Sequence, residues 1–525
     1  MPNSRLIDFA SLRSDLLAGI VVFLVALPLC LGIATASGVE PFAGLLSGIV
    51  GGLVVALLSG SHLSVSGPAA GLVVIVVSAI ASLGSFSAFL AAVLIAGVLQ
   101  FVFGLLRAGQ LASFVPVPVI KGMLASIGLL LIVKQVPLAA GLSASASAAS
   151  ATSAASDASL ATPFGTVLVP ALVLAAVCVI LLFVWESPRA KRFAFVRIVP
   201  GPLAVVALGI AATLGLDAFA PAFALPGEQR VALDALQSFD TLAGALAFPD
   251  FTQLVDADVW RVALTLAVVA SLETLLSLEA VEQMDPQRRR ASPDRELKAQ
   301  GVGNIVAGAL GGLPITAVIV RSSANLNAGA RTRLASFVHG VLLLASVFAL
   351  TAVLNLIPLA CLAAILIQTG YKLARPALFV AMMREGTDRV VPFVATIVGV
   401  LATDLLIGIG IGIAVSMLLA MRANLDDTFA LAEHDDHYLL SFRKDASFLA
   451  KPMLMRCLAR IPDRATVLID TERADFVDRD IRDTLERFIA DAPRRSIAVE
   501  SVQWPRLNGT PKKRLPWARS ASTTS

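Results

Sequence analysis

Long apolar runs, separated by short polar breaks, occupy most of the chain between Asp15 and Met421. A helix needs about 20 mostly apolar residues to cross the hydrocarbon core of a bilayer, and most of the runs approach that length. They are continuous rather than alternating, which argues against a transmembrane β-barrel. The pattern predicts an all-α polytopic membrane protein with fourteen spans: 15–36, 41–59, 67–82, 86–106, 111–133, 164–185, 200–217, 260–280, 297–313, 321–333, 335–356, 359–380, 390–402 and 404–421.

The polar breaks between the runs carry unequal charge. With the N-terminus inside, Arg and Lys collect in the loops that follow even-numbered spans, as at Arg288–Arg290. The largest loop on the other side, 218–258, is acidic and carries one basic residue, Arg230. Cytoplasmic loops are rich in Lys and Arg, so this distribution predicts a multi-pass protein with both termini in the cytoplasm.

The transmembrane region repeats weakly. The third and tenth runs are both short and both open on Ser, Gly, Pro or Arg after a break, seven spans apart. This correspondence predicts a transport region over 15–421 built from two halves of opposite topology, about 15–217 and 260–421. Paired short or interrupted helices in such halves are the usual sequence indication of a binding site near the membrane midplane.

Beyond Met421 the composition changes to that of a soluble segment. Strand-like pieces (438–443, 466–471, 496–502) alternate with helix-like ones (447–460, 477–491), which predicts a small cytoplasmic α/β domain over 422–503. Residues 504–525 form a basic Ser/Pro-rich tail that we expect to be disordered, and residues 1–14 form a cytoplasmic N-terminus.

The composition agrees with a membrane protein. The 525 residues are 57% hydrophobic and 15% charged, with a mean hydropathy of +0.83. The four cysteines are scattered, with neither disulfide nor metal-ligand spacing. No run offers a nucleophile with a base, and the four histidines lie at run ends or in the soluble part, so we do not expect an enzyme.

The third run begins "SHLSVSGPAAG", which places Ser66 and Gly67 before Pro68 and Ala69. Proline is favoured at the first helical position, with a small residue before it as cap. We expect a helix to begin at Pro68 in mid-membrane, with free backbone N–H groups from Ala69 onward. Those groups and the positive end of the helix dipole bind anions. An ordinary helix start at the membrane surface is the alternative.

The tenth run places Arg321 after six residues that do not ionise. If a second half-helix begins near Val320, then Arg321 and Ser322 lie at its N-terminus and face the same cavity. A charge inside the membrane is costly without a partner, so we interpret Arg321 as a ligand of a bound anion that pairs with an acid in the empty state. An arginine that reaches the interface from a helix end is the alternative.

The acid for this site is Glu273, in the middle of the eighth run, with Ser277 four residues later on the same helical face. A carboxylate and a hydroxyl one turn apart suit a Na⁺ site, and the carboxyl group alone suits a proton carrier. A purely structural counter-charge to Arg321 is the other interpretation.

Four segments resemble the sulfate permease (SulP) family of anion transporters, which includes the mammalian anion exchangers: "DLLAGIVVFLVALPLCLGIATASGV", "HLSVSGPAAG", "GLPITAVIVRSSANLNAGARTRLA" and "IPLACLAAILI". The likeness covers about residues 10–420, and more loosely 437–503. It implies two inverted seven-helix repeats divided into core and gate domains, an elevator-like movement of the core, and a C-terminal STAS domain. A homodimer is also implied.

The resemblance also implies roles for particular residues. The anion of the family lies between half-helices three and ten, here Ser66–Ala69 and Val320–Ser322, and the acid of span eight falls on Glu273. In bicarbonate-transporting members an acid and a hydroxyl residue four positions later help to bind sodium, a spacing that Glu273 and Ser277 keep. Glutamate in place of aspartate leaves proton coupling open. In the STAS-like segment, Asp478 and Asp480 replace a residue that can be phosphorylated in many members.

We therefore predict a secondary active transporter of small inorganic anions in a bacterial inner membrane. Bicarbonate is slightly favoured over sulfate, with Na⁺ or H⁺ as coupling ion and no other cofactor. The lipid bilayer is the expected surrounding, and no nucleic acid is expected as partner. A nucleobase permease of the same fold and an uncoupled anion channel are the alternatives.

Overall fold

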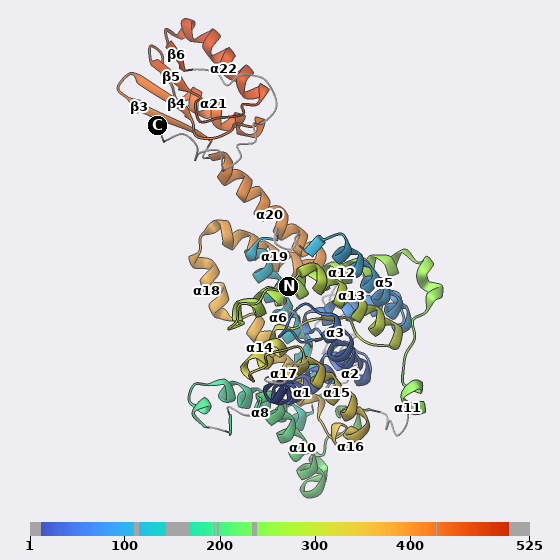
Figure 1. Cartoon of the computed structure of the whole chain (residues 1–525). Helices are drawn as coiled ribbons and strands as arrows, with labels where there is room; N and C mark the ends of the chain where they lie inside the picture. The colour runs from blue at the N-terminus through green and yellow to red at the C-terminus, as the bar shows by residue number, and fades with distance from the viewer. Residues whose placement is uncertain are drawn as a thin grey trace, which may run out of the picture. The chain divides into compact units, whose positions relative to one another are not determined.

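The computed structural model describes residues 12–109, 115–142, 168–193, 195–196, 199–233, 239–426 and 428–502 (Figure 1). The basic tail and most of the predicted N-terminal segment lie outside the described residues. By their contacts the residues form two compact units, Met1–Ile413 and Ala414–Ser525, with the division inside one helix. The predicted domain boundary at 421/422 falls eight residues later, within the same helix.

The first unit is helical apart from two short strands. Its helices up to the acidic loop are α1 (Leu12–Ala36), α2 (Pro41–Val50), α3 (Ala56–Leu58), α4 (Val73–Leu83), α5 (Phe86–Leu105), α6 (Val117–Ala139), α8 (Val169–Glu186) and α10 (Gly201–Phe219). After α11 (Phe239–Gly244) follow α12 (Ala257–Met284), α13 (Pro293–Leu310), α14 (Ile319–Asn327), α15 (Leu334–Ala349), α16 (Thr351–Leu354), α17 (Leu359–Leu373), α18 (Pro376–Arg384), α19 (Thr387–Ala402) and α20 (Leu405–Asp426).

Within the described residues, eight helices are long and apolar enough to cross a membrane, and the segments Ala70–Leu83 and Leu334–Ala349 are shorter apolar helices. The helices at the third and tenth predicted spans are short, as expected: a three-residue 3-10 turn at Ala70–Leu72 leads into α4, and α14 has nine residues. Leu334–Ala349 corresponds to the eleventh predicted span. The polytopic helical class is confirmed, while the count of fourteen spans and their inverted symmetry stay predictions.

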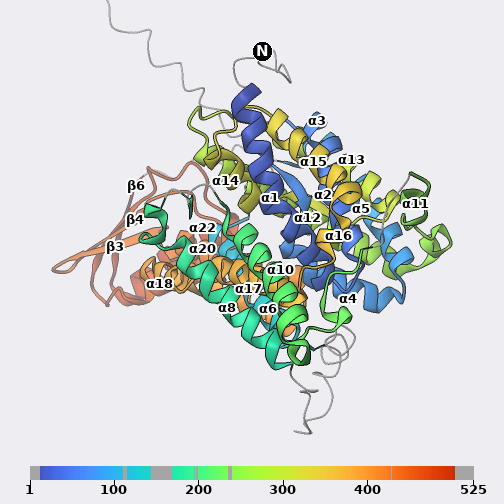
Figure 2. The same cartoon turned by 90° about the horizontal axis from the view of Figure 1, so that it is seen from below.

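The helices of the first unit pack in two groups, which lie on different sides of the view in Figure 2. In one group, α13 packs on α5, α12 packs on α5, and α15 packs on α1 and α2. In the other group, α17 packs on α6 and α8, and α19 packs on α6. The resemblance implies a core and a gate domain, and that division stays a prediction.

Glycines allow the closest of these helix contacts. A Cβ on Gly97 of α5 would lie 2.7 Å from the carbonyl oxygen of Gly301 on α13, and one on Gly370 of α17 would lie 2.6 Å from that of Gly128 on α6. Without a hydrophobic driving force between helices in lipid, small residues that let backbones approach are a main source of packing energy. Both groups of helices therefore use small residues at their central contact.

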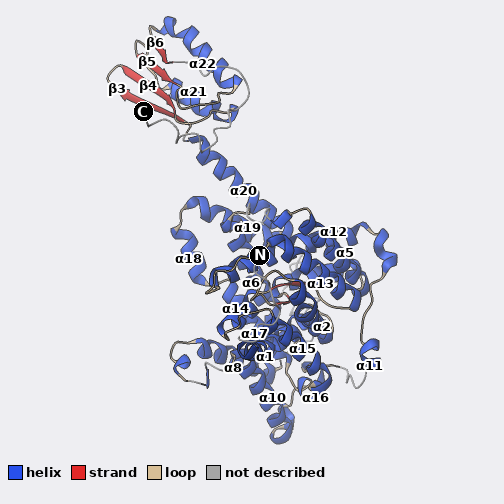
Figure 3. Cartoon of the chain, viewed as in Figure 1, coloured by secondary structure: helices blue, strands red, loops and turns tan. Residues whose placement is uncertain are grey.

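The second unit is a four-stranded sheet in the order β3–β4–β5–β6, covered by helices (Figure 3). Its strands are β3 (Phe429–His434), β4 (His437–Phe442), β5 (Thr466–Asp470) and β6 (Ala498–Val502), with α21 (Lys451–Ala459) and α22 (Arg479–Asp491) between them. The β3–β4 hairpin is antiparallel, and β4–β5 and β5–β6 are parallel. The predicted α/β domain is confirmed as a small α/β unit. One strand, β3, was missed.

Asp478 accepts a hydrogen bond from the backbone of Asp480 and so caps α22.

Candidate functional site

Two three-residue strands lie side by side within the helical unit (Figure 3). β1 (Ser66–Pro68) and β2 (Ile315–Ala317) pair antiparallel, with Ser66 opposite Ala317 and Pro68 opposite Ile315. The amide side chain of Asn304, on α13, holds the end of β2: it accepts a hydrogen bond from the Ile315 N–H (2.6 Å) and donates one to the Ile315 carbonyl (3.0 Å). We call the paired strands β1 and β2 the ribbon.

Each strand of the ribbon leads directly into a helix start. The predicted start near Val320 is confirmed, because α14 begins at Ile319. The predicted start at Pro68 is wrong: Ser66, Gly67 and Pro68 are strand residues, and helical turns begin only at Ala70. Pairing with β2 keeps the backbone of Pro68 extended. The residues before the two starts, Ala69 and Val318, give no side-chain cap. Uncapped N–H groups remain available to a ligand at both starts.

Arg321 folds back from the first turn of α14 onto the ribbon. Its Nη2 donates a long hydrogen bond of 3.4 Å to the Pro68 carbonyl, and a Cβ on Gly67 would overlap its guanidinium. The side chain is fully buried, and both Nε and Nη1 lack a hydrogen-bond partner. A buried charge with unused donors is strongly unfavourable unless a counter-charge joins it.

Two buried side chains near Arg321 were not predicted. Cys30 on α1 and His339 on α15 both lie within its electrostatic range. His339 is fully buried, and neither ring nitrogen has a hydrogen-bond partner among the described residues. His339 lies near the start of its run, as the sequence indicates, but its burial beside Arg321 was not predicted. The hydrophobic pattern around it gave no sign of the inward direction of its ring.

Ser322, predicted to contact the anion, binds the protein backbone. Its hydroxyl donates to the Val318 carbonyl (2.8 Å) and accepts from the Val65 N–H (2.9 Å). Asn325, one turn later, donates to the Leu63 carbonyl (2.9 Å). These bonds fasten α14 to the chain that enters β1. Ser322 thereby holds the two helix starts in register.

Glu273 lies on α12 beside the other helix start. A Cβ on Gly71, in the 3-10 turn after β1, would lie 2.9 Å from its Oε1. The side chain is partly exposed, and its Oε2 has no hydrogen-bond partner. Ser277 is buried one turn further along α12. The predicted pairing of Arg321 with this acid is not present: among the described residues, no carboxylate oxygen lies within 4 Å of the Arg321 guanidinium nitrogens.

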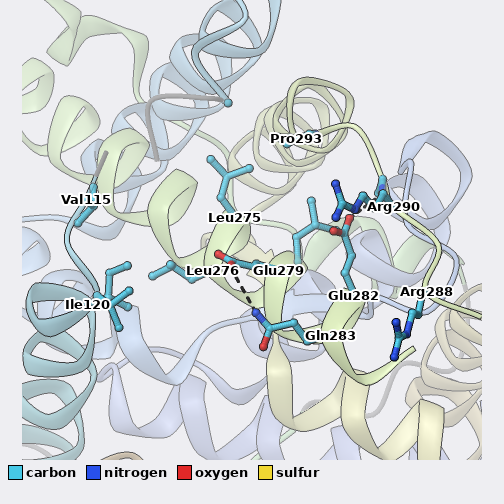
Figure 4. Close-up of a pocket in the computed structure, with 14 residues that line it drawn as sticks. Val115, Ile120, Leu275, Leu276, Glu279, Glu282, Gln283, Arg288, Arg290 and Pro293 are labelled. Atoms are coloured by element: carbon cyan, nitrogen blue, oxygen red, sulfur yellow. Dashed lines mark hydrogen bonds between the residues drawn. The ribbon is translucent and has the colours of Figure 1, made fainter. Parts of the chain in front are cut away.

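A cavity of about 890 Å³ opens along α12, between the two groups of helices (Figure 4). Val115, Val117 and Ile120, at the start of α6, line one wall. On α12 it is lined by Leu275, Leu276, Glu279, Glu282 and Gln283, and Arg288 and Arg290 follow in the next loop. A small apolar gap lies beside Leu272 and Leu276, between α12 and α6. The lining of the larger cavity is thus partly charged, and that of the smaller gap is apolar.

The described residues hold no group of three or more His, Cys, Asp or Glu side chains that could bind a metal ion. The predicted sodium site uses one carboxylate and one hydroxyl, Glu273 and Ser277, and stays a prediction.

Short or interrupted helices whose N-termini point at a shared site are typical of secondary transporters, and α4 and α14 both begin just after a strand of the ribbon. The comparisons with known proteins agree. Residues 12–397 match the model of the sulfate permease family, and the chain belongs to this family. It is accordingly a multi-pass membrane protein of an anion-transporter family, and the expectation that it is not an enzyme is confirmed.

Several relatives and solved structures are similar to the chain. It is 28% identical over 436 residues to Bacillus subtilis YvdB, for which the name proposes sulfate transport, covering 83% of this chain and 78% of that protein. It is 28% identical over 457 residues to the bicarbonate transporter BicA of Synechocystis, covering 84% of this chain and 76% of BicA.

Two solved structures share its fold. The transmembrane domain of a cyanobacterial BicA matches with a TM-score of 0.62 at 23% identity, over 78% of this chain and 98% of that one. The structure of SLC26A9 matches with a TM-score of 0.71 at 16% identity, over 93% of this chain and 84% of that one.

Proposed function

We propose that the protein is a secondary active transporter of a small inorganic anion, bicarbonate or sulfate, with the anion bound between the starts of α4 and α14. The observation that carries this proposal is Arg321, which is fully buried and has two unused donor nitrogens beside the ribbon. A bound oxyanion would supply both the counter-charge and the acceptors that Arg321 lacks. The uncapped N–H groups at Ala70–Gly71 and Ile319–Val320 would complete its coordination.

Coupling to a cation is assigned to Glu273. Its carboxyl group lies at the other helix start and does not pair with Arg321, so it is free to hold Na⁺ together with Ser277, or to carry a proton. The relatives named above include both sulfate and bicarbonate transporters, and their equal identity does not decide the substrate. Bicarbonate remains our preferred anion because of the spacing of Glu273 and Ser277.

Transport would proceed by an elevator-like movement of one group of helices against the other. The cavity supports this mechanism because α6 and α12, which line it, belong to different groups. We further propose a homodimer in a bacterial inner membrane, with both termini in the cytoplasm and a STAS-like C-terminal unit. Membership of the sulfate permease family leaves the nucleobase alternative without support.

The experiment that tests the function is uptake of labelled bicarbonate and labelled sulfate into proteoliposomes, each under an imposed Na⁺ or H⁺ gradient. Saturable uptake of bicarbonate driven by Na⁺ is the expected result, and it would assign the cation to Glu273 and Ser277. Uptake of sulfate driven by H⁺ would keep the anion site and make Glu273 a proton carrier. Unsaturable conductance without gradient dependence would contradict the proposal and indicate a channel.

A further inference from the structure

The ribbon has two faces, and its side chains divide between them. Directly opposite residues of an antiparallel pair project to the same face, and successive residues along a strand project to opposite faces. Ser66 lies opposite Ala317, and Gly67 lies opposite Thr316. The Ser66 hydroxyl accepts a hydrogen bond from Gln300 on α13 (2.7 Å), so the first pair faces α13. Gly67 and Thr316 therefore face the other way.

The face of Gly67 and Thr316 is the one that holds the guanidinium group of Arg321. A Cβ added to Gly67 would overlap Nη1 and would lie 3.2 Å from Cζ of this arginine. Opposite residues of an antiparallel pair have their Cβ atoms about 4.5–5.5 Å apart, so the Cβ of Thr316 lies at about that distance from the same point. One oxyanion, which has several acceptor oxygens, can contact both side chains.

The hydroxyl group of Thr316 is buried and unused. Thr316 is fully buried, and its Oγ1 has no hydrogen-bond partner among the described residues. The same holds for Nε and Nη1 of Arg321. Burial of a hydroxyl without a partner is unfavourable, and valine has nearly the same shape without this cost. A ligand that accepts hydrogen bonds from Thr316 and Arg321 would remove the cost at both residues.

The surroundings of Thr316 differ from those of other hydroxyl groups at the ribbon. Those of Ser66, Ser322 and Thr274 each accept a hydrogen bond from another part of the chain. Thr316 lies opposite a glycine, and the Cα of a second glycine, Gly48 on α2, is 3.7 Å from a Cβ added to Gly67. Neither glycine offers a side-chain partner, so the Thr316 hydroxyl stays available to a ligand.

We propose that Thr316 is a further ligand of the transported anion, which its hydroxyl group binds together with the guanidinium group of Arg321. The inference rests on the proposed function, because it needs an anion at Arg321. The hydroxyl donates to one oxygen of the anion, while Nε and Nη1 donate to the others. Thr316 did not stand out in the sequence, where it belongs to a β-branched segment that looks like ordinary extended chain.

The first test measures transport by the full chain in proteoliposomes, as KM and Vmax for labelled bicarbonate and sulfate. Thr316→Val keeps the shape of the side chain and removes the hydroxyl. We expect it to raise the KM of the transported anion by about 10-fold or more, the range of a hydrogen bond to a charged group, with little change in Vmax. Thr316→Ser returns a hydroxyl and should restore most of the affinity. A normal KM in Thr316→Val would overturn the inference.

The second test separates a ligand from a structural hydroxyl. The purified protein is melted in detergent, in buffer free of bicarbonate and sulfate and again with each anion added. Without anion, Thr316→Val should be at least as stable as the unaltered protein, because it loses an unsatisfied buried group. The rise in Tm on addition of the anion should be smaller in the variant, since this rise grows with affinity. A lower Tm without anion, together with an unchanged rise, would assign the hydroxyl a structural role and overturn the inference.

Thr213→Val is the matched control. Thr213 is also a fully buried threonine, and its hydroxyl donates to the Gly209 carbonyl within α10 (3.0 Å). We expect this variant to leave both the KM and the anion-induced rise in Tm unchanged. An equal rise of KM in the control would mean that loss of any buried hydroxyl impairs transport, against the inference. Thr316→Ala replaces Thr316→Val if the latter does not fold, with the same rise in KM expected.

The inference and the proposed function fail in different ways. Absence of bicarbonate and sulfate uptake in the unaltered protein would contradict the proposed function, and the inference with it. Uptake that depends on Arg321 but has a normal KM in Thr316→Val would contradict only the inference.

Discussion

The two halves of the ribbon site have the same backbone design but opposite chemistry. β1 and the turn after it read Ser-Gly-Pro-Ala-Ala-Gly, with no ionisable side chain, whereas α14 brings Arg321 immediately after β2. In the first half, Gly67 leaves room for the Arg321 guanidinium and Gly71 leaves room for the Glu273 carboxylate. One half supplies space, and the other half together with α12 supplies charge. Space and charge at the ribbon thus come from different segments of the chain.

The largest effect is expected from removing the charge of Arg321. We expect Arg321→Ala to weaken anion affinity by more than about 100-fold, since loss of a buried charge partner leaves the other ion uncompensated. The measurement is KM or competitive binding of bicarbonate and sulfate. Arg230→Ala is the matched control, because Arg230 pairs with Asp217 and should not affect affinity. Unchanged affinity in Arg321→Ala would remove this residue from the site.

The second charge should have a separable role. Glu273→Gln is expected to abolish dependence on the driving ion while it changes anion affinity by less than about 3-fold, because no ion pair joins it to Arg321 and the two are not one unit. Uptake is compared with and without Na⁺ and H⁺ gradients. Normal gradient dependence in this variant would make Glu273 a structural acid.

The space that Gly67 and Gly71 leave can be filled by alanine without changing any charge. Gly67→Ala should displace Arg321 and raise the KM of the anion by about 10-fold, since the guanidinium is the flexible partner and moves aside at the cost of its position. Gly71→Ala should instead impair ion coupling through Glu273. Gly215→Ala is the control, because nothing lies within 4 Å of an added Cβ there. Identical phenotypes for Gly67→Ala and Gly71→Ala would contradict the division of roles.

The smallest effect is expected outside both helix starts, at Asp285 after α12. Burial alone would raise the pKa of this carboxyl group, but hydrogen bonds from the Arg289 side chain and from the Gln287 and Arg289 N–H groups outweigh it and lower the pKa. A lowered folded-state pKa stabilises the protein at neutral pH, and this contribution is lost as the pH falls from the usual aspartate range through the lowered pKa.

The free energy of unfolding of Asp285→Asn should therefore be lower than that of the unaltered protein by about 1–2 kcal/mol at pH 7. This difference should shrink on acidification. Melting in detergent between pH 7 and pH 4 measures it, and the anion KM should not change. A difference that grows as the pH falls would contradict the assignment.

The sequence predicted the helices well and the contacts between distant segments poorly. The helix start near Val320 follows from a local change of pattern, and α14 indeed begins at Ile319. Pro68 was misplaced because the partner that makes it a strand residue, Ile315, lies far away in sequence and leaves no local trace. The second-unit strand β3 was missed because it does not alternate: its first residue is buried and its last three are exposed.

Side-chain partners were the least predictable part of the site. An i, i+4 pair such as Glu296 and Gln300 looks like an ordinary polar helix face, and only the fold shows that this face points inward to Ser66. For the same reason we predicted from the sequence that Arg321 pairs with Glu273, an acid in the middle of an apolar run. The structure separates them, because their side chains lie at the two different helix starts.

The pairing of Ser66 with Ala317 also has a consequence for biosynthesis. A ribosome that adds about 5 to 20 residues per second would synthesise β2 roughly 10 to 50 s after β1. During that interval the amide and carbonyl groups of β1 have no strand to pair with, and each such group left in hydrocarbon costs several kcal/mol. The nascent first half must therefore hold this segment in water, against the translocon or against its own helices until the second half arrives. The ribbon is completed only at that late step of insertion.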